Sequence, residues 1–77
     1  MDMQTLDRLV DFHMRCYDAL PETALEPYEK FLTALIDGLS SESPTEETTL
    51  MVSSLVEMRD EVSELLLQLK EADNAKD

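Results

Sequence analysis

The sequence contains very few of the residues on which several folds and chemistries depend. Among 77 residues there are one Gly, one Cys, one His and no Trp. A single cysteine excludes an internal disulfide and favours a reducing compartment, and a single histidine excludes the Cys/His clusters of structural zinc sites. Alternating Val/Ile/Thr-rich segments are also missing, so we expect no β-strands. These absences predict an all-α protein without a metal or another cofactor.

Basic residues and long apolar runs are scarce as well. Six Lys and Arg stand against 18 Asp and Glu, which gives a formal net charge of −12. Because the basic residues are scattered, we expect no direct binding of nucleic acid. No apolar run approaches the roughly 18 residues of a membrane span, and no basic-then-apolar leader is recognisable. The sequence therefore predicts a soluble, cytoplasmic protein that does not bind membranes.

The apolar residues that are present recur at helical spacing, first over residues 3–20. Asp2 is a candidate N-cap for this segment, and Asp11 with Arg15 forms a favourable i,i+4 pair on its polar side. Pro21 should end the helix, because the residue before a proline avoids the helical region.

The second helical segment covers about residues 25–38. Thr23 and Glu26 fit a capping box, and Pro27 suits a first helical turn. Gly38 is expected to end the helix in a left-handed conformation. This segment is therefore predicted to be a short helix.

The third segment, residues 44–72, has the clearest start signal, with Ser43 as N-cap, Pro44 as the first helical residue and Glu46 closing a capping box. Its apolar residues alternate in steps of four and three, which is the spacing of a bundle or coiled-coil seam. The seam consists of Met51, Leu55, Met58, Val62, Leu65, Leu69 and Ala72. We expect the tail, residues 73–77, to be frayed.

Three consecutive leucines, Leu65, Leu66 and Leu67, decide the predicted architecture. Successive helical residues turn by about 100°, so these side chains fan over roughly 200° of the helix. The first two helices could cover the flank with Leu66, whereas Leu67 lies on the far side. We therefore predict one domain over residues 1–77, a small bundle of two shorter helices and a long C-terminal helix that dimerises through the long helix.

No arrangement of residues in the sequence indicates catalysis. His13 lies in the apolar seam of the first helix, which favours a buried or interface histidine hydrogen-bonded to a neighbour. Cys16 is interpreted as a buried thiol that packs as a small hydrophobe. Nucleophile elbows, Glu-x-x-His motifs, calcium loops and Gly-rich phosphate loops are all missing. We expect the protein not to be an enzyme.

An acidic stripe on the third helix is the best candidate for a functional surface. Like charges one turn apart cost a few tenths of a kcal/mol per pair, so the stripe does not serve helix stability. With the neighbouring leucines it would offer apolar anchors inside an anionic rim. The candidate partner-binding residues are Glu57, Asp60, Glu61, Glu64, Leu66, Leu67 and Glu71.

This stripe predicts a small acidic protein-binding module whose partner has a basic and apolar surface. An inhibitor, an immunity or antitoxin-like factor and a secretion-type chaperone all fit this description. A homodimer is predicted separately, from the small core and the excess apolar surface of the third helix. The alternative is a nucleic-acid mimic, whose carboxylates would occupy a basic groove of a DNA- or RNA-binding protein. Salt separates the two hypotheses, because binding by charge alone weakens steeply as ionic strength rises.

Overall fold

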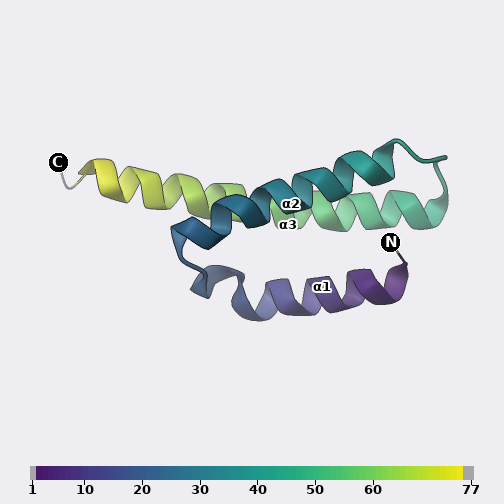
Figure 1. Ribbon diagram of the computed structural model, residues 1–77, viewed down its shortest axis with the longest axis horizontal. Coiled ribbons are helices and arrows are strands. Elements are labelled where there is room, and N and C mark those ends of the chain that lie inside the picture. The colour runs from purple at the N-terminus through teal and green to yellow at the C-terminus, as the bar shows by residue number, and fades with distance from the viewer. Residues whose placement is uncertain (1, 76–77) are drawn as a thin grey trace.

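A computed structural model of the chain describes residues 2–75, and the side chains of residues 2–72. Over that range the elements are α1 (Met3–Cys16), the short 3-10 helix η1 (Tyr17–Ala19), α2 (Glu22–Ser40) and α3 (Glu46–Ala75), with no strand. In Figure 1, α1 and α3 run in the same direction and α2 runs against both. The predicted all-helical bundle of three α-helices is confirmed, whereas dimerisation stays a prediction.

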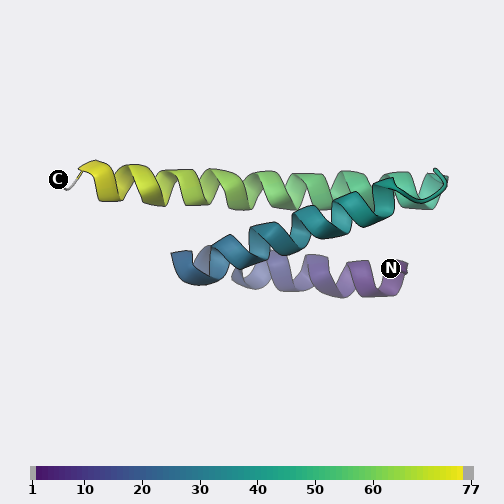
Figure 2. The ribbon, with the colours of Figure 1, turned by 45° about the horizontal axis from the view of Figure 1, so that its top comes forward.

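The core lies mainly between α2 and α3. Its buried apolar side chains are Leu25, Leu32, Ile36 and Leu39 from α2, Met51, Leu55, Met58, Val62 and Leu66 from α3, and Leu6 from α1. The predicted seam of α3 is therefore confirmed from Met51 to Val62, with Leu65 and Leu69 partly buried and Ala72 exposed. Figure 2 shows α3 as a straight rod whose C-terminal end projects beyond the other two helices.

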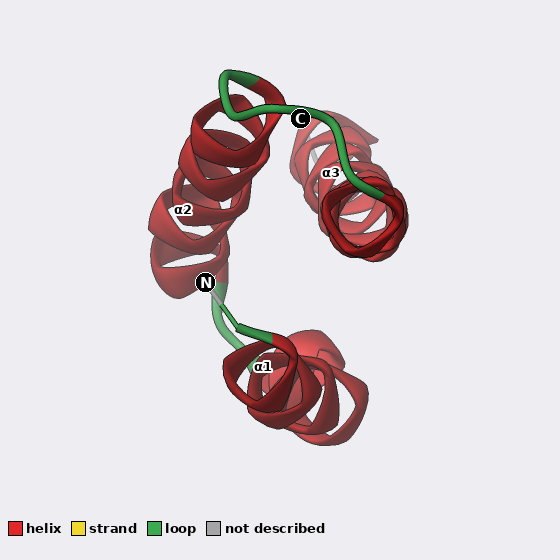
Figure 3. Cartoon of the chain, turned by 90° about the vertical axis from the view of Figure 1, so that its right-hand side faces the viewer, coloured by secondary structure: helices red, strands yellow, loops and turns green. Residues whose placement is uncertain are grey.

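α1 covers one side of the α2–α3 pair and contributes less to the interior. Its buried side chains are Leu6 and His13. Viewed along the bundle, the three helices stand at the corners of a triangle (Figure 3). α1 thus joins the core through one aliphatic and one polar side chain, together with the partly buried Leu9 and Val10.

The start of α1 is as predicted, but its end is not. The Thr5 amide donates to Asp2 Oδ1 at 2.8 Å, which confirms the cap, and Arg15 pairs with Asp11 at 3.3 Å. The predicted helix to residue 20 is wrong, because the α-helix ends at Cys16 and the chain tightens into η1. Leu20, the residue before Pro21, is extended, as a proline requires of its predecessor, so the last turn must narrow before it.

α2 is longer than predicted at both ends. It begins at Glu22, where the amides of Ala24 and Leu25 both donate to the Pro21 carbonyl at 2.9 Å. The N-cap is Pro21 without a side-chain cap, so the predicted Thr23–Glu26 capping box is wrong. Pro27 lies inside the helix. Because proline has no N–H, it cannot donate to the carbonyl four residues earlier, and the helix lacks one backbone hydrogen bond there.

The predicted left-handed end at Gly38 is also wrong. Among the described residues no glycine has a positive φ, and α2 continues to Ser40. Leu39 is buried in the core, so packing against α3 favours another helical turn. The Ser41 hydroxyl then donates to the Gly38 carbonyl at 2.8 Å and satisfies an otherwise free acceptor.

The start signal of α3 lies two residues later than predicted. The Thr48 amide donates to Thr45 Oγ1 at 3.0 Å, so Thr45 takes the capping role expected of Ser43. At its other end α3 extends to Ala75, beyond the predicted residue 72. Residues 76–77 of the predicted frayed tail lie outside the described residues. No helix in the described part of the chain combines the length and the apolarity needed to cross a membrane.

Candidate functional site

The predicted acidic residues all lie on the exposed surface of α3. We call Glu57, Asp60, Glu61, Glu64 and Glu71 the acidic face. Asp60 pairs with Arg59 at 3.6 Å, and Glu61 lies 3.4 Å from His13. Among the described side chains, Glu57, Glu64 and Glu71 form no ion pair. The acidic face therefore keeps unpaired negative charge along the helix.

The two leucines predicted to anchor a partner differ in burial. Leu66 is 5% exposed and belongs to the core, whereas Leu67 is 57% exposed. The expectation that Leu66 is a surface anchor is wrong, because α2 packs over the flank of α3 on which it lies. Leu67, about 100° further round the helix, is left outside this contact.

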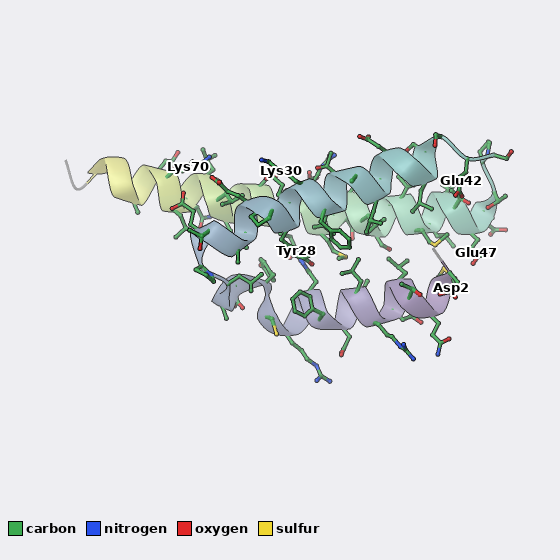
Figure 4. All side chains as sticks on the ribbon, in the orientation of Figure 1. Asp2, Tyr28, Lys30, Glu42, Glu47 and Lys70 are labelled. Atoms are coloured by element: carbon green, nitrogen blue, oxygen red, sulfur yellow. The ribbon has the colours of Figure 1, made fainter. Side chains whose placement is uncertain are left out.

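Both leucines line a groove between α2 and α3. Its volume is about 380 Å³, and its lining consists of Glu26, Glu29, Lys30, Ser63, Leu66, Leu67 and Lys70. Lys70 lies 3.7 Å from Glu26, and Ser63 donates to Glu29 at 2.5 Å. Figure 4 shows Lys30 and Lys70 on the side of the bundle away from α1, whereas Tyr28 points towards α1. Because this groove contains both lysines, its charge is closer to balance than that of the acidic face.

The buried polar centre of the molecule is His13, which has no exposed surface. Its Nδ1 lies 2.9 Å from the Tyr28 hydroxyl and its Nε2 lies 3.4 Å from Glu61 Oε1, although Nε2 has no well-formed hydrogen bond. The His13 ring stacks on Tyr17, with centroids 4.4 Å apart. A carboxylate facing Nε2 favours the proton there, so Nδ1 accepts from the Tyr28 hydroxyl.

These contacts confirm the prediction of a buried histidine hydrogen-bonded to a neighbour. His13 thereby links α1 to Tyr28 of α2 and to Glu61 of α3. Sequence reasoning named neither partner, because residues 15 and 48 positions away carry no local signal of the contact. Cys16, predicted to be buried, is only partly so.

Both tyrosines near His13 are held in the neutral form. Loss of hydration, and then the charge of Glu61, raise the pKa of Tyr28 to about 12. The pKa of Tyr17 is raised by loss of hydration and then by the negative charges of Glu61 and Asp18. Near neutral pH both phenols therefore keep their protons, and negative potential is concentrated where η1 meets α3.

A second, smaller hollow opens at that meeting point. It has a volume of about 290 Å³ and is lined by Tyr17, Glu61, Glu64, Leu65 and Gln68. We call it the α1–α3 notch, since it lies where the α1–η1 segment meets α3. Two of the predicted partner-binding residues, Glu61 and Glu64, are thus brought together with an aromatic ring that the sequence-based prediction did not include.

Exposed carboxylates and apolar side chains make up the surface of the site. His13 has no exposed surface through which it could reach a substrate. Among the side chains described, no three His, Cys, Asp or Glu residues are close enough together to hold a metal ion. Comparison of the chain with protein-family models, with curated proteins and with solved structures finds no match in any of the three.

Proposed function

We propose that this protein is a binding module that recognises a basic and apolar surface of another protein through α3. The observation that carries the proposal is the position of Leu67, three residues after Glu64 and four before Glu71. Residues at these separations are neighbours on a helix, so an exposed leucine stands between two unpaired carboxylates. An apolar anchor with a charged rim is a common design for protein recognition.

Inhibitors, immunity or antitoxin-like factors and secretion-type chaperones are the classes of protein that fit this surface. All of them bind a partner and need no catalytic group of their own. The buried Leu66 takes no part, so Leu67 and the acidic face form the proposed contact. The homodimer through α3 is a separate proposal, and the exposed leucines of that helix, Leu50 and Leu67, are its support.

The test is capture of the partner from the native cell with matched charge variants. One triple variant changes Glu57, Glu61 and Glu64 to Gln, and the control changes Glu42, Glu46 and Glu47, near the start of α3, to Gln. Both remove the same charge, so non-specific attraction falls equally. We expect the wild type and the control to retain the same protein and the acidic-face variant to lose it. Equal retention by both variants would contradict the proposal.

A nucleic-acid mimic is the alternative, and the spacing of the unpaired carboxylates favours it. Glu57, Glu64 and Glu71 follow one another at seven-residue intervals, about 10.5 Å apart along the helix. That is roughly three times the 3.4 Å rise per nucleotide of one DNA strand. A mimic should lose its target steeply between 50 and 500 mM salt and should tolerate Leu67→Ala. A leucine-anchored module with a charged rim should weaken only moderately over this range and should lose its target on Leu67→Ala.

A further inference from the structure

We propose that the α1–α3 notch receives one arginine side chain of the partner protein, with the guanidinium between Glu61 and Glu64 and against Tyr17. This inference rests on the proposed function and specifies which group of the partner is recognised. The notch differs from the rest of the acidic face in being hollow, partly apolar and bordered by an aromatic ring.

The size of the notch indicates one side chain as the occupant. Pockets for small ligands and cofactors have volumes of about 300–1,000 Å³, so a notch of about 290 Å³ lies at the lower limit. Leu65 offers a contact for the methylene stem of a long side chain, and Gln68 offers an amide. Long basic side chains bury their stems in this way and keep their charged ends among polar groups.

The charges around the notch select a cation. Glu61 and Glu64 are three residues apart on α3 and therefore face the same hollow. A guanidinium is planar, carries five N–H donors and can bridge two carboxylates while stacking on an aromatic face. A lysine ammonium is a point charge without this fork, so arginine fits the two carboxylates and Tyr17 better.

His13 gives an independent reason to expect a ligand here. Its Nε2 is fully buried, lacks a hydrogen bond and faces Glu61 Oε1 on the wall of the notch. Buried polar atoms without partners are rare in folded proteins. Glu61 therefore links this buried, unsatisfied atom to the notch, so that His13 reports on a cation bound between Glu61 and Glu64.

The experiment titrates the protein with N-acetyl-arginine-N-methylamide and follows Tyr17, Gln68 and His13 by NMR. The corresponding citrulline compound is the matched control, because it has nearly the same shape without the charge. We expect saturable shifts with a Kd of about 10 mM, because exposed ion pairs and cation–π contacts are individually weak. The His13 resonances should shift as well, because Glu61 contacts both Nε2 and the notch. Equal binding of the citrulline compound would overturn the proposal.

Two charge variants identify the site of binding. Glu64→Gln removes a carboxylate from the notch, whereas Glu57→Gln removes one from the same face outside it. We expect Glu64→Gln to raise the Kd about two- to fivefold and Glu57→Gln to leave it nearly unchanged. Equal effects would show general charge attraction and defeat the notch proposal. If the notch fails these tests while the partner is still captured, the notch proposal is wrong and the proposed function stands. If the probe binds while the acidic-face and control variants capture the partner equally, the proposed function is wrong, and with it the assignment of a partner arginine to the notch.

Discussion

At the scale of single residues, the hydrogen bond between His13 and Tyr28 should contribute to the stability of the fold. Tyr28→Phe keeps the ring but removes the hydroxyl that lies 2.9 Å from His13 Nδ1. A buried acceptor is then left unsatisfied, which costs about 1–3 kcal/mol of unfolding free energy. Urea unfolding monitored by circular dichroism measures this loss. Tyr17→Phe is the control, because it keeps the stacked ring, and an equal loss in both variants would contradict the assignment.

The same hydroxyl predicts how stability depends on alkaline pH. Folding raises the pKa of Tyr28 from 10.0 to about 12, because the phenolate is disfavoured in the folded state. The corresponding stability is fully present below pH 10 and is lost as the pH rises through about 12. We expect the stability difference between wild type and Tyr28→Phe to shrink across this window. Denaturant titrations at several pH values would show it, and a constant difference would be inconsistent with the raised pKa.

Leu66 and Leu67 provide a residue-scale test of the packing of α3. Leu66→Ala opens a space in the core and should cost about 2–5 kcal/mol, whereas Leu67→Ala should change stability by no more than about 0.5 kcal/mol. Thermal and urea unfolding of both variants would measure the contrast. Comparable losses would mean that Leu67 is also covered, for instance by a second subunit. Only Leu67→Ala is therefore a clean test of partner binding.

At the scale of helices, α1 should be the least protected element. It buries Leu6 and His13, whereas α2 buries Leu25, Leu32, Ile36 and Leu39. Elements with few buried apolar contacts open with a smaller free energy than the core. We expect amide hydrogens of α1 to exchange at least tenfold faster than those in the middle of α2 and α3. Hydrogen exchange followed by NMR gives the comparison, and equal protection of all three helices would refute it.

The helices also show what the sequence determines locally. The seam from Met51 to Val62 could be predicted because a single helix imposes its period on every buried position. Helix ends were predicted less well. Gly38 stays helical because Leu39 packs into the core, and Thr45 replaces Ser43 as the cap of α3. In the first of these cases a tertiary contact overrides the local preference.

The candidate site was only partly predictable for a related reason. The acidic face follows from helical periodicity, so its residues were named correctly as exposed carboxylates on one helix. The notch requires Tyr17 from η1 to meet Glu61 and Glu64 from α3, and the His13 contacts require three helices at once. Such contacts arise from the packing of helices and have no signature within one segment. The different burial of Leu66 and Leu67, by contrast, follows from helical spacing, which places Leu66 on the flank that the first two helices could cover and Leu67 on the far side.

At the scale of the whole molecule, size and charge govern self-association. The molecule measures 48 × 23 × 15 Å and carries a formal net charge of −12. At 0.01 M salt the screening length is about 30 Å, so most of its charges interact, whereas at 0.15 M it is about 8 Å. Two copies therefore repel strongly at low salt. The apolar attraction between exposed leucines of α3 depends far less on salt.

The predicted homodimer should accordingly form more readily as salt is added. At tens of micromolar protein we expect mostly monomer in 10 mM NaCl and a growing dimer fraction towards 500 mM, because screening reduces repulsion between like-charged copies. Sedimentation equilibrium across this range measures the fraction, and Leu67→Ala should reduce it while leaving the fold intact. This trend is opposite to that expected for binding a basic partner, which weakens with salt. A monomer at every salt concentration would rule out the homodimer and leave Leu67 free for a different protein.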